Sequence, residues 1–153
     1  MKKYLIDINI ISYLADAESP FHENVRTRFR ALAKDDEAFL SILSLYEFYY
    51  SLSRANDAID PTILRTKEKV FATLPIVPLS DAGGRIFGEL KTAYQSKYGL
   101  SRTALARDTV DLMIASSALE SAAILVSHDQ VFLKIQAAQS GLRLEDWAVA
   151  IET

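Results

Sequence analysis

Short apolar segments that suit β-strands alternate along this chain with longer segments of helical periodicity. Residues 3–7 and 123–127 are examples of the first kind, and the second run, Ala-Ile-Leu-Val-Ser, is apolar on both faces of a strand. Such a strand is buried between two layers, which is typical of parallel sheets. The alternation therefore predicts an α/β domain in which helices cover both faces of a parallel sheet.

The expected elements follow from apolar periodicity and from residues that start helices. Strands are expected at residues 3–7, 38–43, 75–79, 123–127 and 142–147. Helices are expected at 9–16, from Pro20 to about 32, at 45–56, 61–73, 81–97, 109–121 and 130–139, with a polar stretch at 99–107. No repeat or linker interrupts the pattern, so residues 1–153 are expected to form a single domain.

Composition excludes several kinds of chemistry. The chain has no cysteine, which rules out disulfides, thiolate zinc sites and cysteine nucleophiles, and its two histidines are too few for most histidine metal sites. No apolar run approaches the roughly 20 residues of a membrane helix, and the first residues do not resemble a signal peptide. A cytoplasmic protein without a membrane segment is therefore expected.

The net charge of −3 argues against indiscriminate binding to nucleic acid, which needs a broadly basic surface. Neutralising four acids with metal would raise this charge from −3 to +1. A local patch of arginine and lysine thus stays compatible with the composition.

Four carboxylates stand where an apolar segment passes into a helical one: Asp7, Glu47, Asp111 and Asp129. In an open parallel sheet, the crevice beyond the carboxyl ends of the strands is the binding site, so acids at several such junctions are expected to converge. A carboxylate cluster in a chain without cysteine suggests Mg²⁺ or Mn²⁺, because these hard cations prefer oxygen ligands.

Asp111 lies on the helical stripe that also carries Ala115 and Ala118, which is expected to face inward. A buried unpaired charge is costly, so this acid is expected to be protonated, ion-paired or metal-bound. Alternatively, it only favours the positive end of its helix, with Asp108 as the N-cap.

The other three acids also have local explanations. Ser44-Leu45-Tyr46-Glu47 matches a capping box, so Glu47 taken alone is better explained as a cap or a solvated acid. Asp7 either binds metal with Asn9 orienting it, or forms an Asx-turn at the strand exit. Asp129 is either a ligand or a turn residue, and the adjacent His128 fits a surface or capping residue better than a catalytic base.

The same segments resemble, in order and spacing, the motifs of PIN domains, and most closely the VapC-type toxin ribonucleases of toxin–antitoxin pairs. The resemblance covers nearly the whole chain. It rests on Leu5-Ile6-Asp7-Ile8-Asn9 (D-x-N after the first strand), on the apolar segment Ile42 to Glu47, on Asp111 to Leu119 (D-x-x-I-A), and on Leu125 to Asp129 with Phe132 downstream.

The resemblance implies a three-layer α/β/α sandwich with a central parallel sheet. It also implies Mg²⁺- or Mn²⁺-dependent hydrolysis of RNA phosphodiesters by Asp7, Glu47, Asp111 and Asp129. Asp108 could replace or join Asp111. Ser127 and Asn9 are expected to support the site, while Arg102 and Arg107 are either phosphate contacts or ordinary surface charges.

The implied partners are an antitoxin protein and a second copy of the chain. Tyr46, Phe48, Tyr49 and Tyr50 place apolar area on more than one side of their helix, and part of it is expected to be covered by such a partner unless the helix is buried in the monomer. Two alternatives stay open: a PIN-domain RNA-processing nuclease that is not a toxin, and a catalytically inactive PIN-like interaction module. A serine hydrolase is disfavoured because G-x-S-x-G is absent.

Overall fold

The computed structural model describes residues 1–54 and 59–151, and within them five parallel strands form one sheet in the order β3-β2-β1-β4-β5. The strands are β1 (Lys3–Ile6), β2 (Glu37–Ser41), β3 (Ile76–Val77), β4 (Ile124–Val126) and β5 (Arg143–Glu145). β1 pairs with β2 on one side and with β4 on the other, so it lies at the centre of the sheet. The expected parallel sheet is confirmed.

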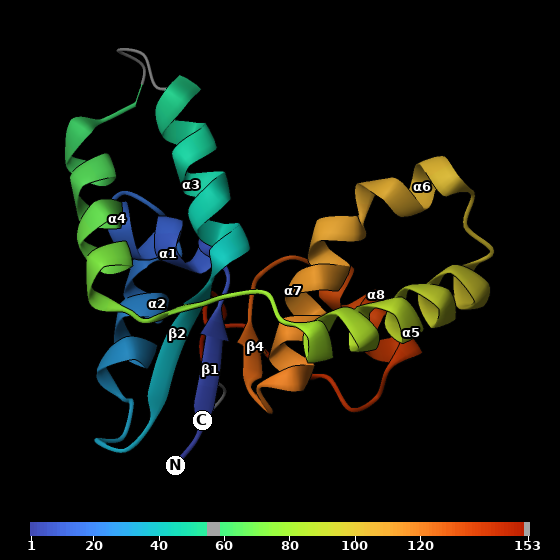
Figure 1. Ribbon diagram of the computed structural model, residues 1–153. Helices are drawn as coiled ribbons and strands as arrows, with labels where there is room; N and C mark the ends of the chain where they lie inside the picture. The colour runs from blue at the N-terminus through green and yellow to red at the C-terminus, as the bar shows by residue number, and fades with distance from the viewer. Residues whose placement is uncertain (55–58, 152–153) are drawn as a thin grey trace.

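Helices cover both faces of this sheet (Figure 1). One side carries α1 (Ile8–Ala15), α2 (His22–Arg30), α3 (Ile42–Arg54) and α4 (Pro61–Thr73). The other side carries α5 (Asp81–Tyr98), α6 (Arg102–Arg107), α7 (Thr109–Glu120) and α8 (Val131–Ala138). The result is the expected three-layer α/β/α sandwich.

The two faces bury two separate apolar clusters, because successive side chains of a strand point to opposite sides. Leu5 and Leu125 pair in register and pack with α5, α7 and α8. Ile6 and Val126, one residue further along the same strands, pack with Trp147 and the helices of the other face. Continuous apolar strands are required here because both faces are covered.

The element bounds differ from the expected ones mainly at three places. The strand expected to end at residue 43 ends at Ser41, and α3 begins at once with Ile42 rather than at 45. The expected end of that helix at residue 56 lies outside the described residues. The stretch 99–107 contains a short helix, α6, which starts after the N-cap Ser101.

Among the described residues, none of the helices is both long and apolar enough to span a bilayer.

Candidate active site

The four predicted acids are carried by elements that meet at the carboxyl edge of the sheet, the upper end of β1 in Figure 1. Asp7 follows β1, Glu47 lies on α3 directly after β2, and Asp129 follows β4. Asp111 lies in the first turn of α7, the helix that leads into β4. Because β2 and β3 extend the sheet on one side of β1 while β4 and β5 extend it on the other, this edge is a topological switch point, where ligands bind in open α/β sheets.

Asp7 is buried and firmly held. Its Oδ2 accepts a hydrogen bond of 2.6 Å from the Ser127 hydroxyl, and its Oδ1 accepts one of 2.9 Å from the Ile8 backbone N–H at the start of α1. Burial raises the pKa of Asp7 above its ordinary value, against the lowering effect of both hydrogen bonds, and the charge of Asp129 raises it further. Asp7 therefore caps α1 and also presents costly negative charge to the site.

The Ser127 hydroxyl links the residues that follow β1 to those that follow β4. Besides donating to Asp7, its Oγ accepts hydrogen bonds from the Asn9 side-chain amide at 3.3 Å and from the Asp129 backbone N–H at 3.1 Å. Asn9 was expected to orient Asp7. Instead it contacts Ser127, and Asp7 occupies the cap position because it is the last residue before α1.

Burial and the other acids together perturb Asp111. Burial raises its pKa to about 7, and the charges of Asp129, Asp7, Asp108 and Glu47 all push in the same direction. A carboxyl that only sat at a positive helix end would be stabilised in its charged form. The acids thus act on one another, and Asp111 lies where their fields add.

Asp108 has a role that differs from the expected N-cap. It precedes α7, but its side chain makes no capping hydrogen bond. Its Oδ2 instead accepts a 2.7 Å hydrogen bond from the hydroxyl of Tyr94, whose ring is buried on α5. Asp108 is therefore partly engaged in fastening α5 to the turn before α7, while Asp111 has no such partner among the described residues.

Glu47 is not part of a capping box, so that interpretation was wrong. α3 begins at Ile42, where the Ser41 hydroxyl accepts a hydrogen bond from the Leu43 N–H. Glu47 lies further along the helix with part of its side chain exposed. Partial burial raises the pKa of Glu47, and the charge of Asp7 raises it further, so Glu47 lies within electrostatic reach of Asp7.

Asp129 is exposed and makes the turn contact that was one of the two expectations for it. Its Oδ1 accepts a 3.0 Å hydrogen bond from the Val131 N–H, which is the expected turn contact. Its charge also raises the pKa of Asp7 and Asp111, so the rest of the carboxylate faces the site. The turn explanation and convergence with the other acids are compatible.

The donor set fits a hard divalent cation in its chemistry. All four side chains offer oxygen ligands, and their shared negative charge is what a cation would relieve. Among the described residues, no group of three or more acids or histidines is gathered tightly enough to enclose an ion directly. Mg²⁺ is usually bound by one or two carboxylates and keeps several waters, which suits a spread cluster better than a closed cage.

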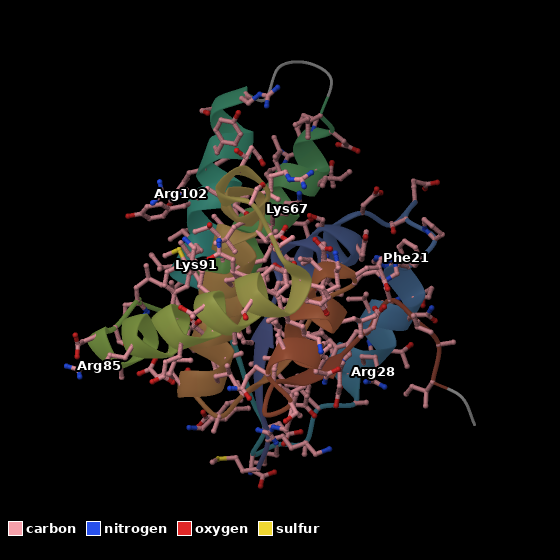
Figure 2. All side chains as sticks on the ribbon, turned by 90° about the vertical axis from the view of Figure 1, so that its right-hand side faces the viewer. Phe21, Arg28, Lys67, Arg85, Lys91 and Arg102 are labelled. Atoms are coloured by element: carbon pink, nitrogen blue, oxygen red, sulfur yellow. The ribbon has the colours of Figure 1, made fainter. Side chains whose placement is uncertain are left out.

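Arg102 and Arg107 lie at the two ends of α6, and both are exposed. Arg102 projects from the surface in Figure 2, on the same side of the view as Lys91 of α5. Because α6 leads directly into Asp108 and α7, these cations border the acidic edge. Their contact with RNA is a proposal.

Two side chains near the site escaped the sequence analysis. Tyr94 lies four residues after Leu90 on the buried face of α5, so its burial could be predicted from the sequence. The hydrogen-bond partner of its hydroxyl could not. Asp146, after β5, accepts a 2.7 Å hydrogen bond from Nδ1 of His128. Nothing in the local sequence signals that contact, which joins residues 18 positions apart.

Comparison with known families identifies this arrangement. The PIN domain model matches residues 4–138. The chain belongs to the PIN domain family. No curated protein matches the chain at a significant level.

Solved structures of VapBC systems share the fold over nearly the full length. VapBC2 from Rickettsia felis, bound to a promoter DNA fragment, is 25% identical, with 95% of this chain and 98% of that chain covered and a TM-score of 0.72. VapBC-1 from nontypeable Haemophilus influenzae is 20% identical over 96% and 99%, with a TM-score of 0.71. DNA-bound VapBC from Salmonella typhimurium is 21% identical over 96% and 99%, with a TM-score of 0.70.

Proposed function

We propose that this PIN domain is a divalent-metal-dependent ribonuclease and the toxin of a VapBC-type toxin–antitoxin pair. The observation that carries the proposal is the electrostatic convergence at Asp111, whose pKa is raised to about 7 by burial and by four other acids. Such a perturbation in a crevice at the switch point of the sheet is typical of active sites. Family membership and the VapBC likeness support the nuclease class.

In this proposal, Asp7, Glu47, Asp111 and Asp129 hold Mg²⁺ or Mn²⁺. The bound ion would lower the pKa of a water molecule and stabilise the charge that develops on the phosphodiester. Asp7 is fixed by Ser127, so it would serve as a rigid ligand. Asp111, which lies in the field of the other acids, would orient the attacking water or accept its proton.

The test is cleavage of single-stranded and structured RNA by the purified protein with and without metal. We expect cleavage with Mg²⁺ or Mn²⁺ and none with EDTA. Asp7→Asn and Asp111→Asn are expected to abolish cleavage with the fold intact, while Asp108→Asn costs less. Cleavage that persists in EDTA would refute the metal mechanism, and a folded wild type without any cleavage would favour an inactive interaction module.

The proposed partners are an antitoxin protein and a second copy of the chain. Phe48 of the aromatic run is buried, but Tyr46, Tyr49 and Tyr50 are 68%, 58% and 62% exposed. This apolar area on α3 is available for a partner, and the similar solved structures are VapBC systems. The proposal includes a cytoplasmic location, where an antitoxin and RNA would both be available.

Light scattering of the isolated chain tests the homodimer, and co-purification with the product of an adjacent antitoxin gene tests the pair. A monomer at micromolar concentration would count against the dimer. An adjacent gene that encodes no DNA-binding antitoxin would favour the RNA-processing alternative.

A further inference from the structure

Three rings from separate segments gather beside the acidic edge and form what we call the aromatic cluster, Tyr13, Phe21 and His128. The ring centroids of Tyr13 and Phe21 are 4.8 Å apart, those of Phe21 and His128 4.7 Å, and those of Tyr13 and His128 5.9 Å. Tyr13 belongs to α1, Phe21 precedes α2, and His128 follows β4. All three rings keep part of their surface exposed.

The aromatic cluster is continuous with the site. His128 lies between Ser127 and Asp129 in the chain, and both neighbours belong to the acid network. Burial raises the pKa of Tyr13, and the charges of Asp146, Asp129 and Asp7 raise it further, so its hydroxyl lies in the field of the same acids. A ligand on these rings would therefore adjoin whatever the acids bind.

The His128 ring is held in a fixed orientation. Its Nδ1 lies 2.7 Å from Asp146 Oδ2, and the other oxygen of Asp146 accepts a hydrogen bond from the Ala148 N–H. A cavity of about 140 Å³ adjoins His128 and is lined also by Ser127, Asp129 and Asp146. Asp146 lies beyond the residues that the PIN domain model matches, so this brace belongs to the C-terminal segment.

Phe21 is also braced from both sides. Its backbone N–H donates to the Ser19 hydroxyl, and the next residue, His22, contacts the Tyr13 carbonyl through Nδ1 at 3.1 Å. Asn24 donates to the Ala148 carbonyl, which ties α2 to the segment that carries Asp146. In Figure 2, Phe21 lies at the start of α2 on the outer edge of the molecule. The rings are thus positioned before any ligand arrives.

We propose that the aromatic cluster is the subsite that stacks an RNA base next to the scissile phosphodiester, with Asp146 as the positioning residue that fixes the His128 ring. The inference rests on the proposed ribonuclease function and names how the substrate is held. Every nucleic-acid base has a flat π-face, and exposed aromatic rings bind single strands by stacking on it. The carboxylates around the aromatic cluster repel phosphates, so a base is the part of the strand that fits here.

On this proposal, the strand crosses the acidic edge with phosphates toward α6 and a base on the aromatic cluster. α6, which carries Arg102 and Arg107, lies on the same side of the sheet as α7, whereas α1 and α2 lie on the other side (Figure 1). Asp7 and Asp129 follow the central strands β1 and β4 between these two layers. Stacking contributes to binding of the ground state and the transition state alike. Its loss should then raise KM and leave kcat nearly unchanged.

Two measurements test the subsite. The first is the steady-state cleavage of a short single-stranded RNA by wild type, Phe21→Leu, Phe21→Trp and Asp146→Asn. We expect KM to rise roughly tenfold or more in Phe21→Leu, to rise also in Asp146→Asn, and to stay near wild type in Phe21→Trp. The matched control is Phe29→Leu, which removes a ring of α2 that packs against Trp147 instead.

The second measurement needs no cleavage. RNA of the same sequence with 2-aminopurine at successive positions is added to Asp111→Asn protein in the presence of Ca²⁺, and quenching by a stacked ring is recorded. We expect the 2-aminopurine fluorescence to be quenched at one position of the RNA. This quenching should be lost when Phe21→Leu is combined with Asp111→Asn, and it should be kept when Phe29→Leu is combined with Asp111→Asn. A folded Phe21→Leu variant with unchanged KM and unchanged quenching would overturn the proposal, as would a variant that loses only antitoxin binding. A wild type that cleaves nothing but still shows Phe21-dependent quenching would refute the nuclease alone.

Discussion

Replacing Asp111 with asparagine is expected to stabilise the metal-free protein. In the folded chain the Asp111 carboxyl is partly buried and faces the charges of Asp129, Asp7, Asp108 and Glu47, all of which raise its pKa. Asparagine has nearly the same shape and hydrogen-bonding groups but carries no charge. The substitution therefore removes a repulsion that opposes folding at neutral pH.

The size of the effect follows from the pKa. A rise from 3.8 to about 7 corresponds to about 4 kcal/mol at about 1.36 kcal/mol for each pH unit. Because the carboxyl is partly exposed, solvent screening reduces the expected gain to about 1–2 kcal/mol. For a chain of this length the melting temperature should rise by about 2–8 °C.

The pH dependence has a definite sign. A carboxyl whose pKa is higher in the folded than in the unfolded state binds more protons when folded, so wild-type stability falls as pH rises from about 4 to about 7. Asparagine does not titrate. The advantage of Asp111→Asn should then be largest above pH 7, shrink as pH falls below 7, and vanish below about pH 4.

Thermal melting in EDTA and in Mn²⁺ is the assay. Mn²⁺ that binds only the folded state stabilises it by RT ln(1 + [L]/Kd), about 2.7 kcal/mol at one hundred times Kd, and the variant should gain less. Asp108→Asn is the matched control and should gain less in EDTA, because this substitution also alters the group that accepts the 2.7 Å hydrogen bond from the Tyr94 hydroxyl. If Asp111→Asn melts lower than wild type without metal and neither responds to Mn²⁺, the shared site is refuted.

Three further substitutions test the supports of the site. Ser127→Ala removes the 2.6 Å hydrogen bond to Asp7 and should lower cleavage strongly, through misplacement of that carboxylate, and metal titration should show weaker binding. Tyr94→Phe removes the hydrogen bond to Asp108 and should destabilise the fold by about 1–2 kcal/mol in urea denaturation, with most of the cleavage activity retained. Among the described side chains, the Ser44 hydroxyl is buried without a hydrogen-bond partner. Ser44→Ala should therefore raise the free energy of unfolding by up to about 1 kcal/mol in urea denaturation. A loss of stability would instead show that this hydroxyl forms a hydrogen bond.

Local patterns predicted most of the fold because the information was local. The N-cap residues Asp60 and Ser80 predict the starts of α4 and α5 from the local sequence alone, and Pro61 supports the first of these. The helix α6 was missed because it has six residues and buries only Leu105, which leaves almost no periodicity to read. Its place is set by packing of Leu105 rather than by propensity.

The sequence suggested which residues to consider for the site, but it did not predict their contacts. The pattern at Ser44 suggested a capping box, yet Ser41 lies at the end of β2 and supplies the first hydroxyl, so the helix begins one turn earlier. The sequence suggested Asp108 as an N-cap, but its carboxylate instead accepts a hydrogen bond from Tyr94, which is 14 residues away. A local motif states which hydrogen bond is available, and only the tertiary fold decides which competing partner forms it.

The convergence of the acids depends on the strand order, which no local pattern contains. If β4 had joined the sheet beyond β3, Asp129 would lie two strands away from Glu47 on the far side, and its charge could not act on Asp7. Instead β4 pairs with β1, so the residues that follow these two adjacent strands, Asp7 and Ser127, meet in a 2.6 Å hydrogen bond. The central place of β1 thus brings acids from opposite halves of the chain together. Burial raises the pKa of Asp111 most, and that topology adds the charges of Asp129 and Asp7, which raise it further.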